Sequence, residues 1–410
     1  MSKITVLSQP FKIKEKVILN NRIVKSALSE VLADSDGSPL ISHINLYKHW
    51  VNGGAALLIT GNIMVDRKFL GEPHNVILDE QSNLEYFKKW TSVIKGTKCH
   101  LWAQLNHPGK QSPSFITWEP VAPSAIALKG ELRAGFNKPR ALKDEEIIKI
   151  IQKFAISAQL AKQVGFTGVQ IHAAHGYLIN QFLSPLHNQR TDRWGGTLEN
   201  RMRFLVQVYH SIREEVGQDF PIAIKLNTAD FQRGGFTEDE FLIVVEKLAK
   251  IGVDLIEISG GTYESQTMIG INHKPSDINR EAYFLEYAEK IRNLVDTPLM
   301  VTGGFRSVTC MSDAIEENKT DLIGLGRPFA IDPNIPKKIL ANPEYKIEVR
   351  NLTTGIKKID QLTLINITWY EHQLWRMAHN QPTEPNLSPW MSICKTMKNV
   401  GIYNFRKRRN

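Results

Sequence analysis

Short apolar runs, many of them rich in β-branched residues, alternate along this chain with longer segments in which apolar residues recur every three or four positions. The short runs predict buried strands, and the longer segments predict amphipathic helices. The predicted strands span residues 23–28, 55–60, 100–105, 168–172, 222–226, 255–259, 299–302 and 322–325. A predicted helix follows each strand, over residues 41–51, 83–94, 144–164, 198–216, 238–251, 284–295, 308–317 and 335–340.

The predicted strands, such as ALLIT at residues 56–60 and PLMVT at residues 298–302, are apolar on both faces. Such strands are typical of a parallel sheet that helices cover on both sides. Eight strand–helix units in one chain favour a closed (β/α)8 TIM barrel of the α/β class over an open, doubly wound sheet.

The strand–helix alternation stops after about residue 343. We expect residues 1–342 to form the barrel and residues 343–410 to form a helical and extended C-terminal tail that packs on it. Within this tail, LINITWYEHQLWRMAHNQ predicts a helix, and TEPNLSPW predicts an extended, proline-containing segment. The aromatic residues of the tail could cover their own barrel or reach a neighbouring subunit, so a homo-oligomer stays open.

Composition narrows the class of protein. With 410 residues, 42% of them hydrophobic, the chain can bury a sizeable core, which excludes global disorder. No apolar run approaches the ~20 residues of a membrane span, and the start MSKITVLSQPFKIKEK is too charged for a secretory signal. Cys99, Cys310 and Cys394 lie far apart and form no CxxC pair, as expected for free thiols. We therefore expect a soluble, cytoplasmic protein without an iron–sulfur or zinc site.

The net charge of +9 is spread along the chain and concentrates only in the terminal FRKRRN. This distribution predicts a solvated tail rather than a nucleic-acid contact. We expect no nucleic-acid or membrane partner.

In a TIM barrel, chemistry belongs to the loops that follow the strands. The fourth predicted strand ends at His172, and its loop carries His175 and Tyr177. Two imidazoles could donate N–H groups to one oxygen, each worth about 3 kcal/mol when well aimed, and a phenol could deliver a proton. Two other interpretations stay open, a zinc site of HxxH spacing and a pair of core histidines. No HExxH motif and no third ligand support the zinc site, and we expect no metal.

A second cluster follows the last two strands. VTGGFRS contains Gly303 and Gly304, and GLGRP contains Gly326 and Arg327. Glycines let backbone N–H groups approach an anion, and a guanidinium can clamp phosphate. Barrels often bind phosphate between these two loops, so a phosphorylated ligand is predicted.

Two polar residues come from the remaining strands. Gln104 ends the third predicted strand, and Lys225 lies in IKLN at the end of the fifth. A lysine inside an apolar barrel is costly unless an anion or an electron-rich ring accompanies it. Together with the phosphate loops, these residues predict a pocket for a flat, phosphate-bearing cofactor.

The segment HAAHGYLINQFLSPLHNQRTDRWGGTLENRMRF, together with NRIVKSAL, QLNHPGKQS and GLGRP, resembles the Old Yellow Enzyme family of FMN-dependent ene reductases. The resemblance covers about residues 10–336 and extends weakly to residue 390. It implies an FMN-binding barrel that takes hydride from NADH or NADPH. The substrate it implies is a small molecule with an activated carbon–carbon double bond, as in an enone or nitroalkene, reduced in a ping-pong cycle.

The resemblance also implies roles for single residues. His172 and His175 would bind the substrate oxygen, and Tyr177 would donate the proton. The implied FMN-binding residues are Ala27, Leu28, Ser29, Asn62, Gln104, His172, Lys225, Gly303, Gly304, Gly326 and Arg327.

Three positions depart from the commoner family pattern. Lys225 stands where arginine is usual, and so offers a point charge in place of a planar fork. Ser29 stands where threonine or cysteine is frequent near the flavin carbonyl, so the redox potential could differ. Trp194 replaces a tyrosine, with a small expected effect. A further charged and polar group, for which we expect a structural role in bracing the loop, comprises Arg190, Asp192, Asn200 and Arg201.

Some family members carry an added iron–sulfur and flavin-adenine module, which needs clustered cysteines that this sequence lacks. Electrons should then pass directly from nicotinamide to FMN. Two alternatives stay open, a phosphate-binding aldolase or isomerase that uses Lys225, and a protein that binds flavin without turnover. The loops over residues 106–140 and 261–280, which would select the substrate, carry no recognisable motif.

Overall fold

Eight parallel strands form a closed barrel in the computed structural model, which describes residues 3–15, 17–260, 281–350 and 352–403. Each strand pairs with its two neighbours, and the pairing of β3 with β4 closes the ring. The barrel strands are β3 (Ile23–Lys25), β4 (Leu57–Met64), β6 (His100–Asn106), β9 (Gly168–Ala173), β10 (Ile222–Asn227), β11 (Leu255–Ser259), β12 (Leu299–Thr302) and β13 (Leu322–Leu325). The predicted (β/α)8 barrel is confirmed.

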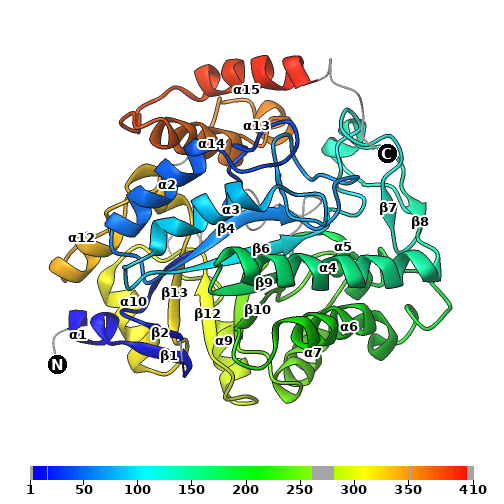
Figure 1. Ribbon diagram of the computed structural model, residues 1–410, viewed down its shortest axis with the longest axis horizontal. Coiled ribbons are helices and arrows are strands. Elements are labelled where there is room, and N and C mark those ends of the chain that lie inside the picture. The colour runs from blue at the N-terminus through cyan, green and yellow to red at the C-terminus, as the bar shows by residue number, and fades with distance from the viewer. Residues whose placement is uncertain (1–2, 16, 261–280, 351, 404–410) are drawn as a thin grey trace.

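Helices surround this barrel (Figure 1). Those that follow the strands are α2 (Ile41–Asn52), α3 (Leu84–Thr91), α4 (Asp144–Val164), α6 (Leu198–Val216), α7 (Glu238–Lys250), α9 (Leu285–Arg292), α10 (Val308–Glu316) and α12 (Ile335–Ala341). Local signals set several of their ends. Thr237 caps α7 in a reciprocal capping box with Glu240, and Gly165 ends α4 in the left-handed conformation at φ 103°.

The lower part of the barrel interior is filled with apolar side chains. Trp102 is fully buried there, and only glycine fits opposite it, because a Cβ on Gly168 would lie 2.5 Å from the indole Nε1. A hairpin of β1 (Phe11–Lys14) and β2 (Val17–Leu19) adds Val17 and Leu19 to this cluster. The apolar interior leaves the carboxyl ends of the strands as the part of the barrel that can hold polar groups.

The first strand is shorter than predicted. Pairing ends at Lys25, and the last ladder contact is made by Ser26, whose N–H donates to the carbonyl of Leu325. Beyond that point the chain leaves the sheet, so Ala27, Leu28 and Ser29 lie at the barrel mouth rather than inside a strand.

Residues after the barrel form three helices, α13 (Lys357–Leu362), α14 (Ile365–Ala378) and α15 (Pro389–Tyr403). Figure 1 shows them stacked at one end of the molecule, with α1 (Lys3–Ser8) and the β1–β2 hairpin at the opposite end. The predicted helix over LINITWYEHQLWRMAHNQ agrees with α14. The predicted extended segment ends sooner than expected, because Pro389, which the first turn of a helix tolerates, begins α15.

Shorter elements complete the described part of the chain. They are β5 (Val76–Ile77), η1 (Ser92–Ile94), β7 (Val121–Ala122), η2 (Glu131–Gly135), β8 (Arg140–Ala141), α5 (Leu178–Leu183) and α11 (Arg327–Ile331). Among the helices described, none is both long enough and apolar enough to cross a membrane.

Candidate active site

A large cavity lies at the carboxyl ends of the barrel strands, where the sequence predicts the chemistry. All the residues predicted for the site line it, namely Ala27, Leu28, Ser29, Asn62, Gln104, His172, His175, Tyr177, Lys225, Gly303, Gly304, Gly326 and Arg327. Segments separated by up to about 300 positions in the chain therefore meet around one space. The predicted selecting loop at residues 261–280 lies outside the described residues.

His172, His175 and Tyr177 form a compact aromatic group on one wall of this cavity. The ring centroids of His172 and His175 lie 5.0 Å apart, and those of His172 and Tyr177 lie 4.9 Å apart, both edge to face. His175 and Gly176 have left-handed backbones, with φ of 59° and 78°, and so turn the chain sharply between strand β9 and helix α5. This turn brings Tyr177 back over His172.

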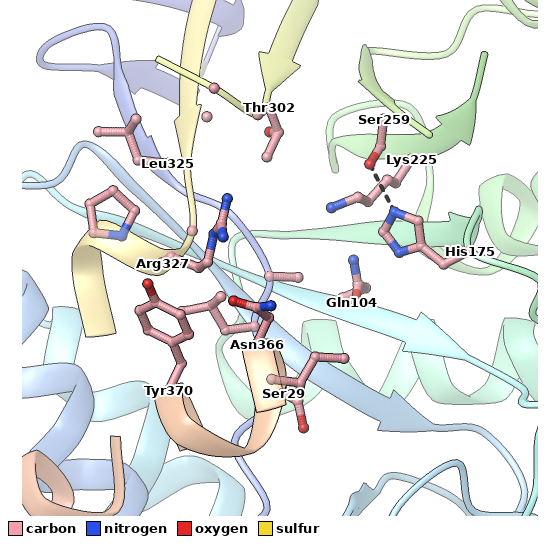
Figure 2. A pocket seen from close by; sticks show the side chains of 18 of the residues that line it. Ser29, Gln104, His175, Lys225, Ser259, Thr302, Leu325, Arg327, Asn366 and Tyr370 are labelled. Atoms are coloured by element: carbon pink, nitrogen blue, oxygen red, sulfur yellow. Dashed lines mark hydrogen bonds between the residues drawn. The ribbon is translucent and has the colours of Figure 1, made fainter. Parts of the chain in front are cut away.

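The two imidazoles are neutral and have different partners. Burial, and next the charge of Lys225, hold the pKa of both His172 and His175 well below its ordinary value. His172 Nδ1 accepts a hydrogen bond from the N–H of Ala174 at 3.3 Å, so its proton resides on Nε2, which can donate. His175 Nε2 lies 2.8 Å from Ser259 Oγ, as Figure 2 shows. His175 is thus held by a side chain from β11 that the sequence analysis did not single out.

Tyr177 is buried at the start of α5. The amide nitrogen of Asn62 lies 3.4 Å from its hydroxyl oxygen, and Asn62 Oδ1 is buried without a hydrogen-bond partner in the described part of the chain. Asn180 Oδ1 accepts from the N–H of Gly176 at 2.7 Å and so fixes the turn that precedes the tyrosine. The phenol is therefore positioned by the backbone of its own loop and by an amide from β4.

Lys225 belongs to a chain of one ion pair and two hydrogen bonds across the barrel interior, which the sequence analysis did not foresee. Its Nζ lies 2.9 Å from Glu257 Oε1, and the other carboxylate oxygen of Glu257 accepts from Gln170 at 2.7 Å. Gln170 in turn accepts from Gln104 Nε2 at 2.7 Å. The cost of burying Lys225 is offset by a protein carboxylate. We call these four residues, from β6, β9, β10 and β11, the interior network.

Arg327 enters the cavity from the opposite side to Lys225 (Figure 2). Within the described residues its guanidinium has no carboxylate partner, and its Cζ lies 6.0 Å from the centroid of the Tyr370 ring. Gly303 and Gly304 nearby have φ of 126° and 84°, a conformation that favours glycine. An unpaired guanidinium beside glycine-rich backbone fits an anionic group such as a phosphate.

Ser29 is bonded to two carboxylates that the sequence analysis missed. Its Oγ lies 2.6 Å from Glu72 Oε2 and 2.6 Å from Glu371 Oε1. Burial raises the pKa of both carboxyl groups, and for Glu371 the adjacent Glu72 adds to the shift and brings its pKa to about 8. We call Glu72 and Glu371 the carboxyl pair, and Ser29 is the residue that bridges them.

Helix α14 supplies a further part of the cavity wall that sequence reasoning assigned only to packing. Its contributions to the lining are Asn366, Ile367, Tyr370 and Leu374. The only signal in the sequence is the helical spacing of these positions, which a purely structural helix shows as well.

The residues expected to brace the loop after β9 have structural contacts. Arg190 pairs with Asp192 and donates to the carbonyls of Pro123 and Leu142 at 2.9 and 2.6 Å. Arg201 pairs with Glu240, and Asn200 donates to the carbonyl of Gly195. None of the four lines the cavity. These contacts support their expected structural role.

Residues 6–345 match the model of the NADH:flavin oxidoreductase / NADH oxidase family. The NADH-dependent flavin oxidoreductase iliE of Hypocrea jecorina (strain QM6a) is 34% identical over 83% of this chain and 90% of its own length. The NADH-dependent flavin oxidoreductase iccE of Talaromyces variabilis is 34% identical over 91% of this chain and 98% of its own length. A cinnamate reductase of Clostridium sporogenes is 31% identical over 83% of this chain, which spans 54% of that protein.

Solved structures give the same fold. A 2-naphthoyl-CoA reductase in complex with 2-naphthoyl-CoA is similar with a TM-score of 0.79 and 26% identity, covering 90% of this chain and 58% of that one. The old yellow enzyme homologue from Zymomonas mobilis has a TM-score of 0.72 at 24% identity, covering 87% of this chain and 99% of that one. The second likeness concerns the fold alone.

Proposed function

The chain belongs to the NADH:flavin oxidoreductase / NADH oxidase family, and from that premise we propose that its cavity reduces activated carbon–carbon double bonds, such as those of enones or nitroalkenes. The protein is a flavin oxidoreductase that uses FMN, with NADH or NADPH as the reductant. The name of the cinnamate reductase relative supports the proposed substrate class. FMN, when bound, supplies the hydride.

The residues that would hold FMN divide by charge and position. Arg327, with the backbone at Gly303, Gly304 and Gly326, would bind the phosphate, because its guanidinium has no carboxylate partner in the described part of the chain. Gln104 and Lys225 would contact the pyrimidine end of the ring, since both reach the cavity from the interior network. Lys225 would carry positive charge to the place where electrons are added.

His172 would bind the carbonyl or nitro oxygen of the substrate. Its Nε2–H is available because Nδ1 already accepts from Ala174, and a neutral imidazole donates without adding charge. His175 uses its Nε2 in the contact with Ser259, so its Nδ1 would be the atom that contacts the same oxygen while that contact stays in place. We therefore assign the primary contact to His172 and the supporting one to His175.

Tyr177 would deliver the proton to the carbon next to the activating group. Its phenol stands 4.9 Å, ring to ring, from the imidazole that would polarise the double bond. The amide of Asn62 at 3.4 Å would stabilise the phenolate that remains. The observation that carries the proposal is this pairing of His172 with Tyr177 in a cavity that also contains Lys225 and Arg327.

The proposal is tested by stopped-flow absorbance on the protein with FMN bound. NADH or NADPH without oxygen should bleach the flavin, and 2-cyclohexenone should restore its colour. Tyr177→Phe should keep the bleaching step and slow reoxidation by the enone by about 10²- to 10⁴-fold, the range for a lost general acid. The matched control is Tyr86→Phe, an exposed tyrosine on α3, which should change neither step. Equal enone reoxidation rates in wild type and Tyr177→Phe would remove the phenol from the mechanism.

The alternative of an aldolase or isomerase that uses Lys225 finds no support in the geometry. Schiff-base formation needs a free amine that can attack a carbonyl. Lys225 Nζ is instead engaged by Glu257 at 2.9 Å, inside the interior network.

A further inference from the structure

Ser29 lies between two acidic side chains that come from distant parts of the chain. Glu72 belongs to the segment between β4 and β5, and Glu371 belongs to α14 of the C-terminal helices. Each places one carboxylate oxygen 2.6 Å from Ser29 Oγ. Neither carboxyl group forms an ion pair with any lysine or arginine in the described ranges.

Counting hydrogens shows that two ionised carboxylates do not fit this arrangement. A serine hydroxyl has one hydrogen and can donate it to one acceptor only, while an ionised carboxylate can only accept. Two contacts of 2.6 Å therefore need a second hydrogen, which one of the carboxyl groups must carry. The three side chains then form a directed chain, in which a carboxylic acid donates to the hydroxyl and the hydroxyl donates to a carboxylate.

The surroundings assign the two ends of this chain. Glu72 Oε2 also accepts from Asn75 Nδ2 at 3.4 Å, which favours the ionised form at Glu72. Glu371 has no such second donor among the groups acting on it, and burial followed by the charge of Glu72 raises its pKa to about 8. The proton therefore resides on Glu371.

Within the described ranges, the cationic groups on neighbouring elements do not pair with Glu371. Lys25 is bonded to Glu30 and to the carbonyl of Ile59, and Arg327 lies over the ring of Tyr370. Tyr177 lies near Gly71, the residue before Glu72. The charge of Glu72 is the one charge that acts on Glu371 from within the described residues.

We propose that Glu72 and Glu371 share one carboxyl proton through Ser29. This hydrogen-bonded chain turns the Ser29 hydroxyl away from the cofactor and sets the charge on that wall of the cavity. Figure 2 shows the hydroxyl of Ser29 directed away from Gln104, Lys225 and Arg327. Since Ser29 donates to Glu72, it keeps no hydrogen for a flavin carbonyl. Glu72 and Glu371 are positioning residues that act through Ser29, and α14 thereby contributes to the chemistry of the barrel.

The shared proton would make the cavity sensitive to pH. Below the pKa of Glu371, at about 8, the three side chains together carry one negative charge, and above that pKa they carry two. The added charge opposes the addition of electrons to a flavin bound nearby, so the flavin potential would fall more steeply above that pH. This consequence, unlike the shared proton, rests on the proposed placement of FMN beside Ser29.

The shared proton is tested by infrared difference spectroscopy of the full chain with FMN bound, titrated from pH 6 to pH 10. Wild type should show the carbonyl band of a protonated carboxyl group that disappears with a midpoint near pH 8. The band should be absent in Glu371→Gln and unchanged in Glu80→Gln, a matched change at an exposed glutamate. A wild-type protein without such a band, or a band that survives in Glu371→Gln, overturns the proposal.

Two further variants should both lower the midpoint. Glu72→Gln removes the adjacent negative charge, which raises the pKa of Glu371. Ser29→Ala removes the oxygen that accepts the hydrogen of the Glu371 carboxyl group, while Ser29→Thr, which keeps a hydroxyl, should restore the wild-type value. A midpoint that rises in Ser29→Ala would contradict the directed chain. These expected shifts of the midpoint do not depend on whether the protein reduces an alkene.

A separate measurement tests whether the proton on Glu371 affects the flavin potential. The flavin midpoint potential of wild type should show a break near pH 8 that is missing in Glu371→Gln. Parallel pH dependences in the two proteins would overturn the coupling to FMN, even with the infrared result intact.

Discussion

Two acidic clusters lie beside the cavity, and they differ in how the charge of their carboxyl groups is offset. In the interior network, Glu257 is matched by Lys225 at 2.9 Å and by the amide of Gln170 at 2.7 Å. In the carboxyl pair, Glu72 and Glu371 have no cationic partner among the described residues, and both contact the Ser29 hydroxyl. The first cluster offsets burial by opposite charge, and the second is expected to offset it by keeping a proton.

The difference teaches where pH can act on this protein. A carboxyl group with a raised pKa changes its charge within the physiological range. The carboxyl pair is therefore the place where we expect pH to change the charge at the cavity wall.

We expect the largest effect from a substitution that breaks the interior network. Lys225→Met leaves Glu257 buried without its cation and should lower the free energy of unfolding by about 3–5 kcal/mol, the usual cost of an uncompensated buried charge. Urea unfolding at pH 7 measures it. Lys88→Met, which removes the partner of Glu85 on the exposed face of α3, should have little effect. A similar small loss for Lys225→Met would mean that Glu257 finds another partner or a proton.

Arg327 differs from both clusters, because it is a cation that has no carboxylate partner among the described residues. Arg327→Gln should weaken FMN binding by roughly 10- to 100-fold, because a hydrogen bond to a charged group contributes about 1.5–3 kcal/mol. Fluorescence titration of the protein freed of FMN measures the dissociation constant. Arg193→Gln, at an exposed ion pair with Asp144, should leave it unchanged. An unaltered affinity in Arg327→Gln would place the phosphate elsewhere.

The carboxyl pair predicts how stability depends on pH. The pKa of Glu371 is raised in the fold, so its contribution to stability is present at low pH and is lost as pH rises towards about 8. Thermal unfolding of wild type should therefore show a decline from pH 6 to pH 8 that is shallower in Glu371→Gln. Equal slopes in the two proteins would show that Glu371 is already ionised at pH 6.

The smallest expected effect concerns a neutral hydrogen bond at the cavity rim. Ser259→Ala removes the partner of His175 and should destabilise the fold by about 0.5–1.5 kcal/mol. Urea unfolding measures this change, and the pH dependence of stability should stay as in wild type, because the pKa of His175 is held well below its ordinary value by burial. A new histidine titration between pH 6 and pH 8 would contradict this assignment.

Much of the fold follows from local patterns in the sequence. The strands β6, β9, β11, β12 and β13 are predicted to within one residue at each end, since a buried parallel strand is a short apolar run whatever its partners are. The aromatic group of the cavity is also local, because His172, His175 and Tyr177 lie within six residues of the chain and follow one strand. The glycine loops after β12 and β13 are recognisable for the same reason.

The sequence by itself determined the barrel, the end of the barrel that carries the chemistry and most residues that line the cavity, because each depends on periodicity or on spacing along the chain. Only the tertiary structure decided the partners of the buried charges. Glu257 meets Lys225 and Gln170 across three strands, and Ser29 meets side chains 43 and 342 positions away. Electrostatic interactions depend on distance in space rather than on order along the chain, so which acid keeps a proton is settled only when the chain has folded.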